Sequence, residues 1–458
     1  MRFFFLFFIT LIFGLTAQNK PVLYGFDNIP QGLLLNPGAE ANYKAHVGVP
    51  LLSGLHVSAN ISGITVADVF SDESIGVIPG IDFTTKVSNA IESLGDKDYL
   101  SINSQVEVLS GGYKINKRDY VSGGFYTEFD AFVGFPKQLL QLARDGALPY
   151  LGRSFTLNDV NVTADLLGVL HLGISRRMSE RITAGARFKI YSGSLNVNST
   201  NNSGTFVTRE GENSIYDHSL FSVDGEVNSS GFFDDNDETP DESIVGNTFL
   251  SKNFGVGFDF GLTYHINEQL EFTASILDLG FLTYSKNTRN ATLNGSYHYS
   301  GEEFIFDGFN INRQALNTLE DSVVYADNRD SYTVLRPLKF NSSIRYSFGK
   351  SRYLATCHDI RMKDFYDNAI GAQVFSVLRP NGIRMALTGF YERKFASFLN
   401  TKVTWTIDDF SATNIGLGVS TNIWKINLYG AVNNVFGLAD VSNTHTAGIQ
   451  FGINLLLN

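Results

Sequence analysis

The chain has 458 residues, 43% of them hydrophobic, including 38 Phe and 20 Tyr, a composition too aromatic for a disordered protein. Its net charge of −11 comes from one stretch, Glu210–Ser251, which holds eleven acidic residues and no Lys or Arg, while the remaining acids equal the 35 bases in number. No basic stripe is present to neutralise phosphates, so we exclude nucleic acid as a partner.

The first segment has the pattern of a secretory signal peptide. Arg2 precedes an apolar run, Phe3–Leu15, and small residues follow up to Ala17. The run is shorter than the roughly 20 residues that a membrane-spanning helix needs. We therefore predict a signal peptide at residues 1–17, cleavage near Ala17–Gln18, and export of the mature chain.

Beyond residue 44, apolar residues recur at every second position in ten or more segments. In Phe254–Tyr264 they alternate with Gly, Asp and Thr, and after a turn at Asn267–Gln269 the alternation continues in Leu270–Ile276. Such a pattern is typical of strands with one face in lipid and one in a lumen. Charged residues fall consistently on the non-lipid face: Arg187, Lys189, Asp259, Glu271, Arg345, Arg384 and Lys402.

These segments predict an all-β fold, a single antiparallel transmembrane β-barrel of about 14 strands (12–16) over residues 44–458. The sheet must close, because backbone groups in lipid have no water to bind. Long connections at Glu210–Ser251 and Asn287–Ser331 are expected outside the cell. Short turns are expected on the periplasmic side, at Asn116–Arg118, Met178–Glu180, Gly349–Ser351 and Asn381–Gly382.

Two segments break the alternation and show helical spacing. Val87, Ile91 and Leu94 form one such set, and Leu139 and Leu142 follow Pro136, a residue suited to a first helical turn. We predict short loop helices that pack on the barrel rim; a lid or partner surface is the alternative.

The last strand carries an apolar pattern at the C-terminus. Gln450, Gly452, Leu455 and Leu457 resemble the recognition signal of outer-membrane barrels, although the customary terminal Phe is missing. The resemblance implies that the barrel assembly machinery is a partner.

Several stretches together resemble one family of uncharacterised outer-membrane barrels of the Bacteroidota, the domain of unknown function DUF5723. They are Asn36–Gly38, Val49–Leu55, Phe135–Lys137, Gly185–Gly193, Ser275–Gly280 and Asn414–Gly418. The resemblance covers nearly the whole mature chain and implies a barrel in the outer membrane.

The N-terminal segment, residues 18–43, contains Asn36-Pro37-Gly38. This tripeptide is distantly similar to the Asn-Pro-Ala element in the hatch of fatty-acid-transporter-type barrels, with Gly38 in place of alanine. The similarity implies a segment that folds into the lumen and obstructs it. A simple turn leading into the first strand is the alternative.

Two further constellations have little chemical support. Asp234, Asn236 and Glu238 alternate like calcium ligands, but the glycine that such a loop needs is replaced by Thr239, so a solvated acidic loop is favoured. Cys357 and His358 are adjacent, so on a strand their side chains diverge and cannot form a dyad. The single cysteine also excludes an internal disulfide. We predict no enzyme activity and no cofactor.

Two function classes remain. The first is transport of a small or hydrophobic molecule, which rests on the distant hatch similarity. The second is a structural or partner-binding barrel, accessory to protein secretion or surface assembly, which rests on the long outer loops. Lumen-facing charges of both signs fit either a wet channel or a filled interior, because strand register decides which charges meet.

Overall fold

The computed structural model describes residues 20–26, 29–65, 67–68, 83–200, 202–211, 216–232, 244–249, 251, 253–301, 306–307, 310–311, 325–350, 366–396 and 398–457. The expected signal peptide lies outside these residues. So do Asp234, Asn236 and Glu238, and also Cys357 and His358.

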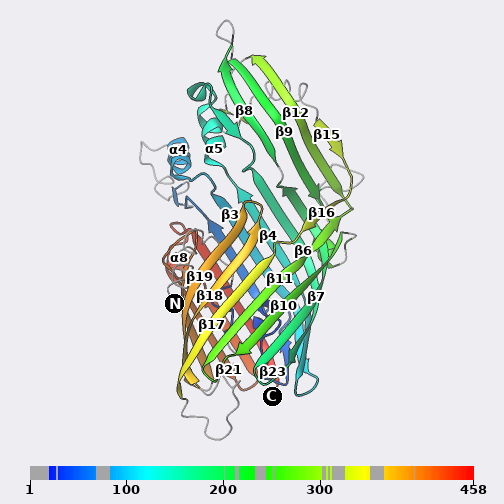
Figure 1. Ribbon diagram of the computed structural model, residues 1–458, viewed down its shortest axis with the longest axis vertical. Helices are drawn as coiled ribbons and strands as arrows, with labels where there is room; N and C mark the ends of the chain where they lie inside the picture. Colours follow the sequence, from blue (N-terminus) through cyan, green and yellow to red (C-terminus); the bar gives the residue numbers. More distant parts are fainter. Residues whose placement is uncertain are drawn as a thin grey trace.

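Fourteen antiparallel strand positions close into a barrel (Figure 1). Two short strands, β1 (Ala45–Gly48) and β2 (Leu55–Ile61), share the first position, because both pair with the second strand and with the last one. The other positions, in order, are β3 (Tyr99–Lys114), β4 (Asp119–Gly134), β6 (Asn161–Arg177), β7 (Ile182–Ser199), β10 (Phe254–His265), β11 (Leu270–Tyr284), β17 (Lys339–Lys350), β18 (Tyr366–Arg379), β19 (Gly382–Ala396), β20 (Leu399–Ile407), β21 (Asn414–Ile423), β22 (Ile426–Val432) and β23 (Thr446–Leu457). The predicted barrel and its strand number are confirmed.

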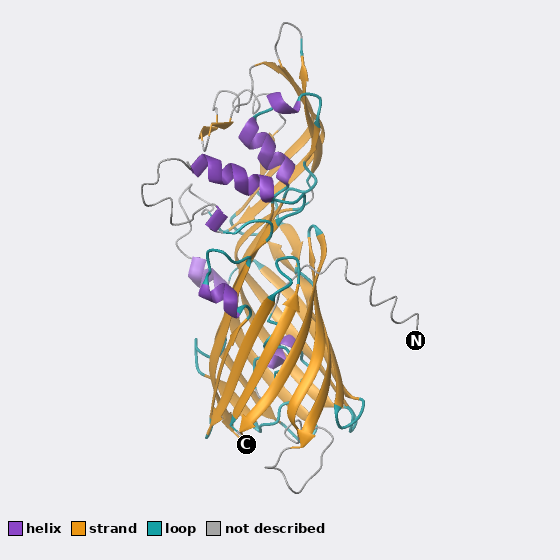
Figure 2. Ribbon diagram, turned by 90° about the vertical axis from the view of Figure 1, so that its left-hand side faces the viewer, coloured by secondary structure: helices purple, strands orange, loops and turns teal. Residues whose placement is uncertain are grey.

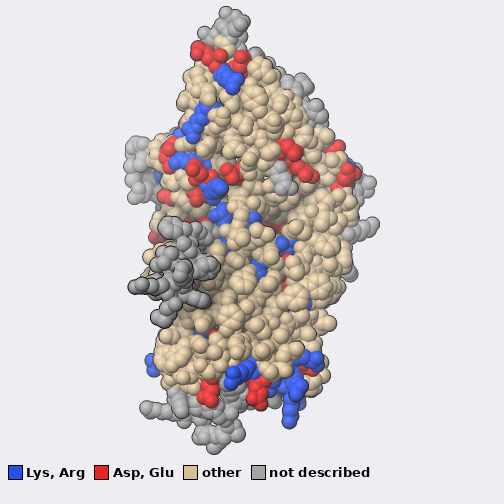
Figure 3. Space-filling view, in the orientation of Figure 1, with Lys and Arg blue, Asp and Glu red and all other residues tan. Residues whose placement is uncertain are grey.

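The outer wall is apolar, as the alternation predicted. In β10, Phe258 and Phe260 are exposed, while Asp259 between them is fully buried toward the lumen. Figure 3 shows charged side chains gathered at the lower rim and in the upper part of the molecule, with a mostly uncharged band between them. Such a band suits contact with lipid. Among the described residues, no helix is long and apolar enough to cross a membrane.

One expected turn is on the wrong side. The tight turn at Asn381 joins β18 to β19 at the end that carries the long connections, where the Asn381 side chain contacts Asn161 at the start of β6. The sequence also predicted a short turn at Gly349–Ser351, but β18 begins only at Tyr366, after residues that the structure does not describe. The alternation of apolar residues shows where the strands are but not at which end of the barrel two strands are joined. The predicted side for the Asn381 turn was therefore wrong.

The long connections build a unit beyond one rim, here called the outer unit (Figure 1). It contains β5 (Ser154–Thr156), β8 (Ser203–Glu210), β9 (Tyr216–Ser230), β12 (Thr288–Gly301), β13 (Phe306–Asp307), β14 (Asn310–Ile311), β15 (Tyr325–Asn328) and β16 (Tyr332–Leu335). Its helical elements are α4 (Phe83–Ser93), α5 (Lys137–Asp145) and the 3₁₀ turn η2 (Leu148–Tyr150). The remaining helices are α2 (Gly32–Leu35), α6 (Ile244–Phe249) and α8 (Val435–Ala439). Both predicted loop helices are present as α4 and α5, and Pro136 precedes α5.

A cluster of polar contacts around Glu92 holds α4 against α5. Arg144 Nη2 donates to Glu92 Oε1 at 2.7 Å, and Gln141 reaches the same carboxylate.

Hydrogen bonds from Arg144 and Gln141 lower the pKa of Glu92. A lowered pKa means that this contact is complete above the ordinary value of 4.5 and is lost as the pH falls through the lower folded value. We expect lower amide protection factors in α4 below that pH, with exchange rates corrected for their intrinsic pH dependence, and no such change in the protection factors of Glu92→Gln.

The only two tryptophans mark both edges of the apolar band. Trp405 pairs with Ile415 near the outer rim, and Trp424 follows β21 at the opposite end, with exposed fractions of 54% and 89%. The intervening strand spans about 20–25 Å at about 3.3 Å per residue and a tilt near 40°, close to the height of a barrel's lipid band.

In brominated lipids, the tryptophan fluorescence of the Trp405→Phe and Trp424→Phe proteins should be quenched most strongly by bromines near the headgroups. Strongest quenching at the bilayer centre would contradict this placement.

Candidate functional site

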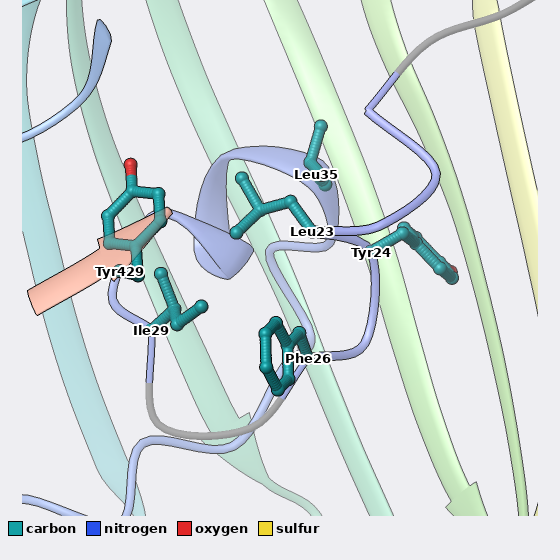
Figure 4. Packing of buried hydrophobic residues seen from close by; sticks show 6 residues of the cluster. All are labelled: Leu23, Tyr24, Phe26, Ile29, Leu35 and Tyr429. Carbon is teal, nitrogen blue, oxygen red and sulfur yellow. The ribbon is translucent and has the colours of Figure 1, made fainter. Parts of the chain in front are cut away.

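The N-terminal residues 20–26 and 29–43 lie inside the barrel, and we call the chain from residue 20 to 43 the luminal segment. Figure 2 shows their short helix, α2, within the ring of strands. Leu23, Tyr24, Phe26 and Ile29 pack into a buried cluster with Tyr429 on the wall (Figure 4). Apolar side chains of the segment therefore have their own small core inside a largely polar lumen.

Polar side chains from the wall hold the irregular backbone of the luminal segment. Gln31 exchanges two hydrogen bonds with Asn454, each 3.0 Å long, and donates to Glu107 at 2.7 Å. Carbonyl groups of the segment accept hydrogen bonds from Gln373 on β18, Lys402 on β20, Arg187 on β7, Ser275 on β11 and Ser175 on β6. Because buried carbonyl groups need partners, these contacts fix the segment at many points around the circumference.

Asn36, Pro37 and Gly38 form a tight turn against two neighbouring strands. Asn36 Oδ1 accepts from Gly38 N at 2.9 Å, and Asn36 Nδ2 donates to Leu262 O at 3.3 Å. Wall glycines make room for the turn: a Cβ on Gly185 would lie 2.0 Å from Pro37 O, and one on Gly261 would lie 2.1 Å from Asn36 Oδ1. Gly38 itself has no space for a Cβ, which would lie 2.5 Å from the backbone of Gly261.

A buried histidine joins the end of the luminal segment to the wall. His265 Nε2 lies 3.2 Å from Glu40 Oε2, and His265 Nδ1 lies 3.6 Å from Glu271 Oε2. Thr183 Oγ1 donates to the other oxygen of Glu40 at 2.6 Å. Glu271 is the register partner of His265 on the adjacent strand β11, whereas Glu40 comes from the luminal segment, so only folding of that segment into the barrel completes this contact.

Above the luminal segment, ion pairs cross the lumen. Lys339 on β17 lies 3.4 Å from Glu128 on β4, and Arg379 on β18 lies 2.5 Å from Asp130 on β4. Arg336, just before β17, lies 3.2 Å from Asp165 on β6. Since β4 is the third strand position while β17 and β18 are the eighth and ninth of fourteen, these pairs join facing walls. We call this layer of six residues the constriction.

Other luminal charges pair with neighbours on the same wall. Lys189 Nζ lies 2.9 Å from Asp259 and 2.6 Å from Asp278, while Arg187 Nη1 lies 3.4 Å from Asp259. The sequence left open whether these charges line a wet channel or pair with one another, and the structure shows them paired.

The sequence pattern did not single out the constriction residues. Glu128 and Asp130 occupy alternate positions of a strand, so their common luminal face could have been predicted. Their partners could not, because the paired bases come from strands across the barrel. Within the described residues, no group of three His, Cys, Asp or Glu side chains could hold a metal ion.

The four residues of the expected assembly signal lie on β23. Gln450 and Gly452 are buried toward the lumen, while Leu455 and Leu457 are exposed on the outer wall. Recognition by the assembly machinery stays a prediction.

A closed 14-strand barrel with an apolar outer wall and a filled lumen defines the chain as a transmembrane β-barrel protein. The chain belongs to DUF5723, a family of unknown function, whose model matches residues 37–433, and this confirms the resemblance seen in its sequence.

Similar solved structures include a FadL homologue of Pseudomonas aeruginosa, with 10% identity, 96% of this chain and 98% of that chain covered, and a TM-score of 0.44. The toluene transporter TbuX of Ralstonia pickettii has 12% identity, 95% coverage of both chains and a TM-score of 0.40. The toluene transporter TodX of Pseudomonas putida has 11% identity, coverage of 96% and 94%, and a TM-score of 0.36. No curated protein matches the sequence.

Proposed function

We propose that this protein is a gated channel of the outer membrane for small molecules, closed here by its own luminal segment. The observation that carries the proposal is the close fit of the Asn36-Pro37-Gly38 turn against Gly185 and Gly261 on the wall. We call this contact the seat of the turn. Outside that seat, single hydrogen bonds from wall side chains such as Lys402 and Gln373 can exchange with water when the segment moves, while the Gln31 contacts and the apolar cluster around Tyr429 must also be released.

Small polar molecules are the permeants that the lumen supports best. The passage beyond the luminal segment is lined by buried charges, including Glu128, Asp130, Lys339 and Arg379. A hydrophobic molecule, the other alternative from the sequence, would have to displace these charges without replacing their partners.

The proposed location is the cell outer membrane, reached after cleavage near Ala17–Gln18. The apolar band supports contact with outer-membrane lipid, and the pattern at Gln450–Leu457 supports insertion by the barrel assembly machinery.

The direct test is single-channel recording in planar bilayers. The full chain should show low or no conductance, and a barrel lacking residues 20–43 should conduct. Equal, low conductance from both proteins would argue against a gating role for the luminal segment. Heat-modifiable migration of both proteins in detergent gels would verify that each barrel is folded.

A second candidate function is partner binding by the outer unit, as an accessory to protein secretion or surface assembly. The specific support is the extended sheet in which β9 (Tyr216–Ser230) pairs with β12 (Thr288–Gly301) beyond the barrel rim. A barrel that stays silent after removal of residues 20–43, and that co-purifies with an exported protein through this unit, would favour the second function.

A further inference from the structure

The constriction separates charge by wall. Its three carboxylates, Glu128, Asp130 and Asp165, lie on the adjacent strands β4 and β6. Its three bases lie on the facing side, on β17, β18 and the residues just before β17: Arg336, Lys339 and Arg379. One further carboxylate, Asp278 on the neighbouring strand β11, stands beside this wall and lies 2.9 Å from Lys339. Opposite charges on facing walls produce an electric field across the passage rather than along it.

Every charge of the constriction is largely buried. The side chains of Arg336 and Arg379 are 2% and 7% exposed, and that of Glu128 is 6% exposed. Aromatic rings support two of the bases, with Arg379 over Phe132 at 5.6 Å and Arg336 over Tyr191 at 5.5 Å. Moving the walls apart without replacing the lost partners would leave buried charges uncompensated, which is costly.

We propose that the constriction selects small zwitterions, molecules with one ammonium and one carboxylate group. The ammonium group takes the place of a base opposite Asp130 or Glu128, and the carboxylate takes the place of an acid opposite Arg379 or Lys339. A cation satisfies only the acidic wall and leaves the Arg379 guanidinium without a carboxylate, whereas Lys339 keeps Asp278 at 2.9 Å. An anion satisfies only the basic wall. Singly charged ions therefore still carry current through the opened barrel, but they cross several-fold more slowly than a zwitterion.

This inference rests on the proposed channel function. The test uses full-length protein in liposomes at zero membrane potential, with the luminal segment loosened by Gly38→Ala. Efflux is measured for β-alanine, its cationic amide and the anion 3-hydroxypropionate, in which a hydroxyl group replaces the ammonium group, three probes of similar size. We expect β-alanine to leave several-fold faster than either singly charged probe.

Neutralising an ion pair tests whether the constriction causes the preference. The double variant Asp130→Asn with Arg379→Gln should make the three efflux rates similar. A second double variant, Glu128→Gln with Lys339→Met, should have the same effect and serves if the first folds poorly. The matched control is Asp119→Asn with Arg176→Gln, which neutralises an ion pair on β4 and β6 at the far rim and should keep the preference.

The outcomes separate the two proposals. Equal efflux of all three probes from the Gly38→Ala barrel, or a preference that survives both neutralised variants, would overturn zwitterion selection and leave the channel function standing. Efflux no faster than from protein-free liposomes, for every probe and from both the Gly38→Ala barrel and the barrel lacking residues 20–43, would overturn both.

Discussion

Gly38→Ala should raise the conductance of the full-length barrel several-fold. The added methyl group would lie 2.5 Å from the carbonyl carbon of Gly261 and 2.7 Å from Leu262 N, both backbone atoms that cannot yield by a rotamer change. The turn must therefore leave its seat, which weakens the hydrogen bond from Asn36 to Leu262. Single-channel recording of the wild-type and variant proteins measures the effect.

Gly32→Ala is the matched control for this change. Gly32 lies in the same luminal segment, but a Cβ there meets nothing within 4 Å, so its conductance should stay at the wild-type level. Should Gly38→Ala conduct no better than Gly32→Ala, the seat would be shown to matter for packing alone. The reciprocal variant Gly261→Ala should open the barrel too, since its Cβ would meet Asn36 Oδ1 at 2.1 Å.

Asp130→Asn should produce one of the largest losses of stability that a single substitution can cause here. It leaves the Arg379 guanidinium buried without its carboxylate, and removing one partner of a buried ion pair costs about 3–5 kcal/mol. Urea unfolding of the detergent-solubilised protein, followed by tryptophan fluorescence, gives the free energy of unfolding.

The double variant Asp130→Asn with Arg379→Gln should recover much of that loss, because no unpaired charge remains. Asp119→Asn is the matched single control on the same strand. Its partner, Arg176, is 57% exposed, so water can solvate the base that is left behind and the loss should be small. Equal losses for Asp130→Asn and Asp119→Asn would contradict the burial of the constriction.

The barrel could be predicted from the sequence because each strand is recognised from the alternation of neighbouring residues. Residues such as Phe258 and Phe260 alternate with Asp259, and this parity alone tells which side chain faces lipid. Helical spacing around Ile91 and Leu139 was equally local, and α4 and α5 lie where it was expected. The prediction placed the Asn381 turn at the wrong end of the barrel, because the alternation of apolar and polar residues does not tell in which direction a strand crosses the membrane.

The lumen could not be predicted in the same way. Lys339 meets Glu128, and Gly38 meets Gly261, only because a closed sheet of fixed register brings distant strands face to face. A shift of one residue in register would turn wall side chains such as Lys339 and Glu128 toward lipid. The sequence by itself determined a lipid-facing cylinder of about 14 strands with a polar interior. Only the tertiary structure decided that the luminal segment occupies this interior and that ion pairs narrow it above, at the constriction, since those contacts form only when the sheet closes.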